Sequence, residues 1–387
     1  MTDYHPGLDG VIATESSISN IDGKKGILSY RGYSIEELAK KSTFEETSYL
    51  LLTGELPKKE ELKTFTDEIN KNRNLPKGLL TLLENLPKDS NSMNVLQLAV
   101  SSLASFYSIE FSPEELKAKK YNQDYFLRVS SKLIGSIGTI VTAWNRIRQG
   151  KPYIPAQQKL SYAENFLNML DDKRHSSDLV NKIMDATLVL HGEHTINAST
   201  FTAMVTASTL ANPSQVIASA IGSLSGPLHG GANQKVVEML DEIGSVDNAK
   251  DWLNKTLESK QIVWGMGHRE YSVKDPRANI LTDLVKELFE EQSGKVSKIF
   301  ETAMELEKQC EEKLSKKGVY ANVDFYSGIL YKEIGIPVDL FTTIFAISRT
   351  PGWLAHWIEQ VSNNKIFRPT QRYNGLGHKS YVKITDR

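Results

Sequence analysis

One histidine lies on a glycine-flanked turn in the segment SGPLHGGANQ (residues 225–234). An apolar series of helical spacing follows at 236–243 and predicts an amphipathic helix that begins just after His229. Unpaired backbone N–H groups and the positive end of the helix dipole disfavour a second positive charge, so we expect a neutral imidazole that donates a hydrogen bond. Gly230 and Gly231 lack a Cβ and let a ligand approach the backbone. The alternative is a turn between two helices with a surface histidine.

Helical signals dominate the rest of the chain. Capping-box spacing, in which Ser or Thr precedes Glu by three residues, occurs at Ser34, Thr43 and Ser161. Helical periodicity runs through five long segments: 121–149, 177–190, 196–210, 296–316 and 338–362. The one clear hairpin signal is Asp22-Gly23, within residues 11–30. The sequence therefore predicts an all-α protein with a small N-terminal β-hairpin.

Composition narrows the class of partner and the compartment. The 387 residues carry a net charge of -1, and the charges of both signs are interspersed, which argues against nucleic-acid or membrane-surface binding. The longest apolar stretch, at 134–144, is too short to span a bilayer. The N-terminal residues show neither a secretory nor an import signal, and the single cysteine, Cys310, excludes an internal disulfide framework. We expect a cytoplasmic protein.

A second glycine-bearing segment is VWGMGHREYSVKDPR (residues 263–277). Asp275, followed by proline, is a strong N-cap for the next helix. Arg277 then lies in the first turn, where a cation opposes the helix dipole, and such a position is expected where a ligand supplies an anion. The alternative is an arginine paired with a nearby carboxylate. The glycines before His268 allow backbone to approach a ligand, although they lack the full dinucleotide fingerprint.

A third segment, KGVYANVDFYSG (residues 317–328), carries Asp324 among apolar and aromatic residues. Partial desolvation there would raise the pKa of the carboxyl and make it a usable general base near neutral pH. The plain alternative is that Asp324 caps the following helix. Two histidines and one acid on three such segments suit a reaction in which a carboxylate removes a proton from carbon while imidazoles donate to oxygen.

Taken together, these segments resemble the citrate synthase family. The signatures SGPLHGGANQ, GMGHREYSVKDPR and NVDFYSG occur in the family's order and roughly at its spacing, and the similarity covers essentially the whole chain, including the early IDGKKGILSYRGYSIEELA. The resemblance implies a Claisen condensation of acetyl-CoA with oxaloacetate, followed by hydrolysis of citryl-CoA. The CoA thioester would be a substrate, and the family uses no metal and no redox cofactor.

The resemblance also assigns roles to single residues. Asp324 looks like the base that deprotonates the acetyl methyl group, His229 like the donor to the enol, and His268 like the group that polarises the oxaloacetate carbonyl. In His-Gly-Glu-His (residues 191–194), His194 would hold oxaloacetate. Without the family, this tetrapeptide would be a weak metal-pair candidate, ranked below a helix-end histidine with its hydrogen bonds satisfied.

Three arginines, Arg277, Arg349 and Arg368, match the family's carboxylate-binding arginines, and a guanidinium fork suits a dicarboxylate because it binds it bidentately. The family supplies Arg368 across a dimer interface, which implies a homodimer or a higher homo-oligomer. It further implies a large helical domain (1–230 and 336–387) and a small one (231–335), which close over the active site.

The family pattern also predicts where CoA binds: Val263, Gly265, Met266, Gly267, Lys274, Lys317 and Asn322. Three departures affect this region or the C-terminus. Ser272 stands where a basic residue is usual, Ala321 replaces a usual proline, and the common RPR reads RPT after Phe367. The CoA-phosphate contacts are therefore the part that the motifs specify least.

Two alternatives remain at this stage. A 2-methylcitrate synthase has the same catalytic residues but uses propionyl-CoA, and one methylene discriminates by only about 1–3 kcal/mol in an apolar pocket. A non-catalytic helical protein that kept the scaffold would have lost site residues, and His229, His268 and Asp324 are all retained.

Overall fold

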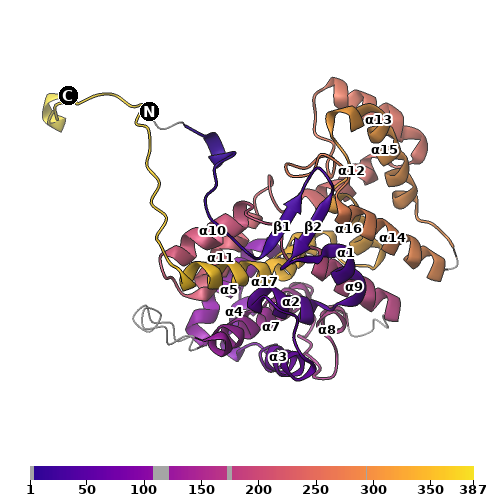
Figure 1. The fold of residues 1–387 in the computed structure, drawn as a ribbon, viewed down its shortest axis with the longest axis horizontal. Helices are drawn as coiled ribbons and strands as arrows, with labels where there is room; N and C mark the ends of the chain where they lie inside the picture. The colour runs from indigo at the N-terminus through magenta and orange to yellow at the C-terminus, as the bar shows by residue number, and fades with distance from the viewer. Residues whose placement is uncertain (1–3, 108–121, 172–176, 293) are drawn as a thin grey trace.

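The computed structural model describes residues 4–107, 122–171, 177–292 and 294–387, and most of them are helical (Figure 1). The first half contains η1 (Pro6–Leu8), β1 (Ser19–Asp22), β2 (Ile27–Tyr30), β3 (Tyr33–Ser34), α1 (Ile35–Lys41), α2 (Phe44–Thr53), α3 (Lys59–Lys71), α4 (Lys77–Glu84), α5 (Ser92–Phe106), α7 (Gln123–Arg148), α8 (Tyr162–Leu170) and α9 (Asp178–Leu190). The second half contains α10 (Ala198–Ser208), α11 (Pro213–Leu224), α12 (Ala232–Ile243), α13 (Val246–Glu258), α14 (Pro276–Glu291), α15 (Lys298–Leu314), η2 (Ser315–Lys317), α16 (Val323–Glu333), η3 (Val338–Leu340), α17 (Phe341–Ser362) and η4 (Ile384–Asp386).

The predicted fold class is confirmed in both of its parts. All five long helical segments contain a helix, and the predicted caps Ser34, Thr43 and Ser161 each accept a hydrogen bond from the backbone N–H three residues later. The hairpin also forms, with β1 and β2 antiparallel and paired from Ser19–Tyr30 to Asp22–Ile27. A third strand of two residues, β3, was not predicted, because so short a segment leaves no periodicity to detect.

Helix α17 crosses the middle of the body (Figure 1), packed against α2, α7, α10 and α11. Almost all of its residues from Phe341 to Trp357 are buried, including polar ones such as Arg349 and His356. Burial of a polar side chain costs free energy unless it is paired, so these polar groups must find partners inside the protein. The buried part of α17 therefore carries polar and charged side chains that pair with groups on neighbouring segments.

Helices α12 to α16 form a second group, on the right of Figure 1, in which α12 and α14 pack on α16 and α13 packs on α15. Glycine allows this contact: a Cβ at Gly328 of α16 would lie 2.4 Å from the carbonyl oxygen of Asn233 in α12. The group coincides with residues 231–335, for which a separate small domain remains a prediction.

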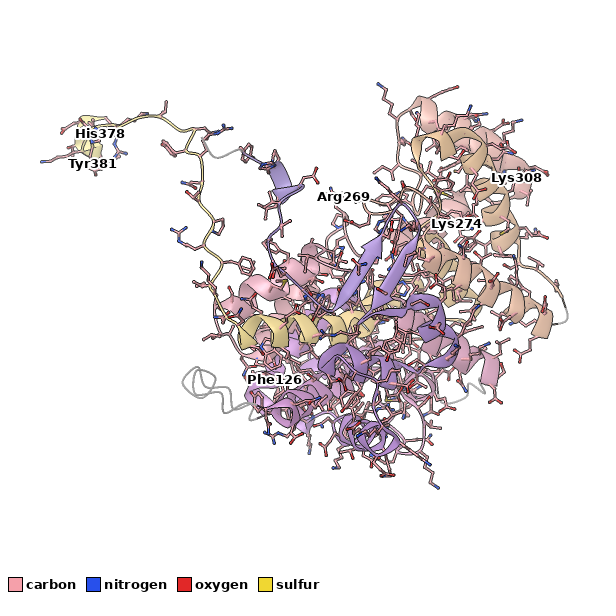
Figure 2. All side chains as sticks on the ribbon, in the orientation of Figure 1. Phe126, Arg269, Lys274, Lys308, His378 and Tyr381 are labelled. Atoms are coloured by element: carbon pink, nitrogen blue, oxygen red, sulfur yellow. The ribbon has the colours of Figure 1, made fainter. Side chains whose placement is uncertain are left out.

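The C-terminal residues leave the body as an arm. Beyond α17 the chain is mostly exposed, and His378 and Tyr381 lie far from the helices (Figure 2). The arm nevertheless carries large exposed apolar side chains, among them Ile366, Tyr373, Leu376 and Tyr381. None of the helices in the described ranges is long and apolar enough to cross a bilayer.

Candidate active site

Two of the predicted site histidines meet beside a tyrosine. The ring centroids of His194 and His268 lie 5.0 Å apart, and that of Tyr271 lies 4.9 Å from His268. The hydroxyl of Tyr271 is 3.1 Å from Nε2 of His194. His194 follows α9, whereas His268 and Tyr271 lie on the loop before α14, so the tertiary fold joins two of the motifs that are far apart in sequence.

Backbone geometry fixes the proton of His268. Its Nδ1 accepts a hydrogen bond from the backbone N–H of Glu270 at 3.0 Å, which leaves the proton of a neutral ring on Nε2. Burial, assisted by the charge of Arg277, lowers the pKa of His268 to about 4. The ring is therefore neutral at pH 7 and carries one N–H donor on the side away from Glu270.

The same arrangement occurs at His229 with the two nitrogens exchanged. The backbone N–H of Ser199 points to Nε2 of His229 at 3.2 Å, so the ring proton lies on Nδ1. The hydroxyl of Ser199 also lies 2.8 Å from Nε2, and it accepts a hydrogen bond from the indole N–H of Trp353. These contacts hold the ring in one orientation.

The neutrality that we predicted for His229 is confirmed, but its cause differs. Burial is the main reason that the pKa of His229 falls to about 4, and the positive charge of Arg349 adds to it. Helix α12 begins at Ala232, with Gly231 as its N-cap, so the predicted position beside the helix start is also confirmed.

Asp324 lies in the first turn of α16 but does not cap it. Asn322 is the N-cap, since its side chain accepts the backbone N–H of Asp324 at 2.9 Å, and the alternative role predicted for Asp324 is wrong. Oδ1 of Asp324 is buried and has no hydrogen-bond partner among the described residues. Burial raises the pKa of its carboxyl to about 6, although the charges of Arg277 and Arg349 oppose the rise. Asp324 thus has the properties of a base that works near neutral pH.

Arg277 follows the alternative that its position suggested, an arginine paired with a nearby carboxylate, while a ligand anion at this position remains a prediction. It is buried, and its Nε and Nη2 donate to the two oxygens of Asp275 at 3.0 and 2.8 Å. Asp275 also caps α14 through the backbone N–H of Arg277, as predicted. The pair keeps the guanidinium fixed, and its charge still acts on His194, His268 and Asp324.

Arg349 is buried on α17. Its Nε donates to the carbonyl oxygen of His191 at 2.8 Å, and its guanidinium lies 4.9 Å from the ring centroid of Phe345. Its positive charge helps to lower the pKa of His194 and His229 and opposes the rise in the pKa of Asp324. Arg277 and Arg349 are therefore the shared electrostatic neighbours of the predicted base and histidines.

Two loops carry most of this site and pair with each other. Met266 and Ala321 form an antiparallel bridge, Gly267 N–H donates to Tyr320 O at 2.7 Å, and Asn322 N–H donates to Gly265 O at 2.9 Å. Gly265 has a φ of 77°, and a Cβ there would lie 2.9 Å from Cα of Phe325, so both backbone conformation and space require glycine. This pairing places the His268 loop beside the start of α16.

Some predicted ligands lie outside this cluster. Arg368 is exposed on the C-terminal arm, and its Nη1 donates to the neighbouring Pro369 O at 3.0 Å. Lys317 is exposed at the end of η2, while Val263 is buried. Lys274 points inward: its Nζ lies 2.6 Å from the buried Glu307 Oε1 and 5.5 Å from the ring of Tyr326. Its ammonium is thus already paired inside the small group of helices.

A buried carboxylate beside the site residues, Glu193, was not predicted from the sequence. Glu193 is fully buried, and its Oε1 lies 3.1 Å from Nε2 of His356 and accepts from Ser19 Oγ at 3.1 Å. Its charge acts on Arg349. The HGEH tetrapeptide was the available signal, but it was considered only for its histidines. His191 instead has its Nδ1 2.8 Å from Thr187 O, as expected of a helix-end histidine.

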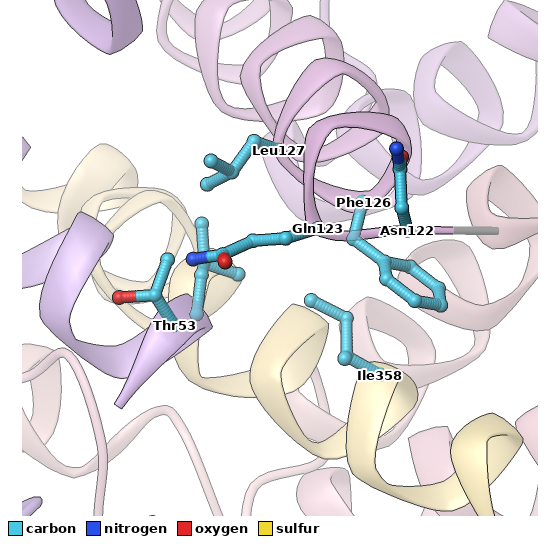
Figure 3. A pocket seen from close by; sticks show the side chains of 7 residues that line it. Thr53, Asn122, Gln123, Phe126, Leu127 and Ile358 are labelled. Carbon is cyan, nitrogen blue, oxygen red and sulfur yellow. The ribbon is translucent and has the colours of Figure 1, made fainter. Parts of the chain in front are cut away.

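A separate pocket lies between the end of α2, the start of α7 and α17 (Figure 3). It contains none of the predicted site residues and no titratable side chain, and it is lined by Leu52, Thr53, Asn122, Gln123, Phe126, Leu127 and Ile358. Its lining offers no group for acid–base chemistry.

Comparison with known proteins agrees with this geometry. A family model described as citrate synthase, C-terminal domain, matches residues 7–370. A citrate synthase of Acidithiobacillus ferridurans is 46% identical over 99% of this chain and 98% of its own, and one of Synechocystis is 47% identical over 100% and 96%. The chain is an enzyme of the class that transfers an acyl group. It belongs to the citrate synthase family.

Solved structures show the same fold. Citrate synthase from Pyrobaculum aerophilum superposes with a TM-score of 0.92 at 37% identity, covering 99% of this chain and 95% of that one. Citrate synthase from Thermoplasma acidophilum, described as a ternary complex with carboxymethyl coenzyme A and oxaloacetate, superposes with a TM-score of 0.91 at 32% identity, and the match covers 100% of both chains.

Proposed function

We propose that this protein is a citrate synthase that condenses acetyl-CoA with oxaloacetate and hydrolyses citryl-CoA to citrate and CoA. The observation that carries the proposal is the carboxyl of Asp324, with a buried Oδ1 and a pKa raised to about 6, which shares the charge of Arg349 with His229 and that of Arg277 with His268. Backbone N–H groups set the proton positions of these two neutral histidines. The Thermoplasma relative bound to a CoA analogue and oxaloacetate supports the choice of substrates.

In the first step, ionised Asp324 takes a proton from the methyl carbon of acetyl-CoA. The electron pair of the broken C–H bond moves into the thioester, and His229 Nδ1–H donates a hydrogen bond to the oxygen that gains charge. The imidazole of His229 can be this donor because Ser199 N–H donates to its Nε2, which leaves the ring proton on Nδ1. The product is the enolate of acetyl-CoA, stabilised by the hydrogen bond from His229, and Asp324 holds the proton.

In the second step, the enolate carbon attacks the ketone carbon of oxaloacetate, and the ketone oxygen takes up a proton, which balances the one held by Asp324 and gives the hydroxyl of citryl-CoA. His268 Nε2–H polarises the ketone oxygen, and His194, held by Tyr271, contacts the same substrate. Arg277 and Arg349 neutralise the oxaloacetate carboxylates. Water then hydrolyses the thioester of citryl-CoA, and citrate and CoA leave. Each step is a proton transfer or a carbonyl addition, for which these residues supply acid and base, so the proposed reaction uses no metal or redox cofactor.

The proposal includes a homodimer in which Arg368 of one chain completes the site of the other. Its support is the extended arm: Arg368 is exposed there and donates to the adjacent Pro369, and the arm exposes apolar side chains that a partner could cover. The domains 1–230 with 336–387 and 231–335 would close over the substrates. The CoA contacts would come from Val263, Gly265, Met266, Gly267, Lys317 and Asn322, with Lys274 contributing only if it leaves Glu307.

The test is release of free thiol from acyl-CoA in the presence of oxaloacetate. We expect a kcat/KM for acetyl-CoA that exceeds the value for propionyl-CoA, and an unchanged rate after treatment with a metal chelator. A preference for propionyl-CoA would assign the protein as a 2-methylcitrate synthase instead. No thiol release from either substrate would contradict the proposed function.

A further inference from the structure

The turn of the β1–β2 hairpin lies against the loop that carries His268. The carbonyl oxygen of Gly23, the first residue of this turn, accepts the backbone N–H of Ser272 at 3.1 Å. The approach is so close that a Cβ at position 23 would lie 1.7 Å from the carbonyl oxygen of Glu270. Since Gly23 does not have a positive φ, space rather than backbone conformation requires glycine here.

The residue that Gly23 touches also sets the proton of His268. The N–H of Glu270 donates to Nδ1 of His268 at 3.0 Å, and its carbonyl is the group that meets Gly23. The next residue, Tyr271, contacts His194 Nε2 through its hydroxyl at 3.1 Å. A shift of the Glu270 backbone would therefore disturb both histidines that face oxaloacetate in the proposed reaction.

The base of the same hairpin holds the other histidine loop. Ser19 Oγ donates to Glu193 Oε1 and accepts the backbone N–H of Thr195, each at 3.1 Å. The hydroxyl of Tyr30 donates to Glu193 O at 2.9 Å. Both flanking residues of His194 are thus bound to β1 or β2, while the turn between these strands contacts the His268 loop.

We propose that the β1–β2 hairpin is a positioning element that sets His268 relative to His194, with Gly23 as its key positioning residue. The inference rests on the proposed function, because the pair of histidines acts on oxaloacetate there. Gly23 touches no substrate and acts through the backbone of Glu270.

The main test is the Gly23→Ala variant. The Glu270 carbonyl must move by on the order of 1 Å to admit the methyl group, and a displacement of that size lowers kcat roughly 10- to 100-fold. Gly32→Ala is the matched control, because Gly32 lies between β2 and β3 with a φ of 89° and no atom within 4 Å of its Cβ position. It strains the backbone of the same small sheet without touching the His268 loop, so we expect an unchanged kcat.

A second measurement reads the position of the proton directly. Nitrogen NMR of protein labelled in its histidine rings, with His268→Asn to identify the signal, should show one tautomer of His268 in the unsubstituted protein and in Gly32→Ala. In Gly23→Ala the Nδ1 signal should shift as its hydrogen bond from Glu270 weakens. This readout does not depend on turnover, so it separates failure of the inference from failure of the proposed function.

A milder variant covers the case in which Gly23→Ala does not fold. Ser272→Ala removes only the 3.4 Å hydrogen bond from the Ser272 hydroxyl to Gly23 O, and we expect kcat to fall about two- to fivefold with an unchanged Tm. The inference is overturned if Gly23→Ala keeps the His268 signal and kcat of the unsubstituted protein. An equal loss of kcat in Gly32→Ala would overturn it too, because general weakening of the hairpin would then explain both.

Discussion

Arg349 and Arg368 both match carboxylate-binding arginines of the family, but in the structure Arg349 is buried and Arg368 is exposed. Arg349 is buried in the central helix α17, where Nε donates to His191 O at 2.8 Å. Arg368 lies exposed on the C-terminal arm, and its hydrogen bond goes to the adjacent residue. In the proposed dimer, this difference would separate the part of the site that lies within one chain from the part that a second chain supplies.

The largest expected effect is on kcat when a site residue that lies within one chain, Asp324, is changed. Asp324→Asn should lower kcat by about 10²–10⁴-fold, because general-base catalysis contributes that much, while oxaloacetate still binds. Steady-state kinetics and calorimetric titration with oxaloacetate measure the two effects. The matched control is Asp185→Asn: burial also raises the pKa of Asp185, to about 7, but its carboxylate accepts the backbone N–H of Phe44, and we expect a normal kcat. Near-normal turnover of Asp324→Asn would remove it from the role of base.

The next effect concerns Arg368, which a second chain would supply in the proposed dimer. Asp324→Asn and Arg368→Leu should each be inactive as homodimers. If Arg368 acts across subunits, every mixed dimer has one site with both groups intact, so subunit exchange at equal concentrations should restore about a quarter of the unsubstituted activity. Mass spectrometry of intact dimers verifies the exchange. Proven exchange without recovery would place Arg368 in the site of its own chain or outside it.

The sequence predicted those features that depend on neighbours in the chain. The hairpin at Asp22-Gly23 and the cap by Asp275 follow from local hydrogen bonds and turn preferences. The role of Asp324 as a base was predicted from the family resemblance of its motif and stays a prediction. Contacts between distant segments were not accessible. Nothing near Ser199 indicates that its N–H sets the tautomer of His229, and nothing near Lys274 indicates its buried partner, because such pairs are specified only by tertiary packing.

A smaller effect is expected from pH. The base acts when ionised, and burial raises the pKa of Asp324 to about 6, so kcat/KM for acetyl-CoA should be constant above that pH and fall about tenfold per pH unit below it. His229 and His268, with pKa values of about 4, stay neutral over most of this range. A pH profile of Asp185→Asn should keep the same midpoint. A midpoint that moves in this control would assign the titration to Asp185 instead.

The smallest effect concerns stability. Arg368→Leu should change the free energy of unfolding of the chain by no more than about 0.5 kcal/mol, as is usual for a surface substitution, because its side chain is exposed and its hydrogen bond goes to the adjacent Pro369. Arg349→Leu should cost several times more, since it leaves the carbonyl of His191 without its buried donor. Urea unfolding at several protein concentrations measures both values and separates folding from dimerisation. If Arg368→Leu destabilises the protein only at concentrations where dimers form, the contact that it loses lies on the partner, which is the arrangement that the exposed arm favours.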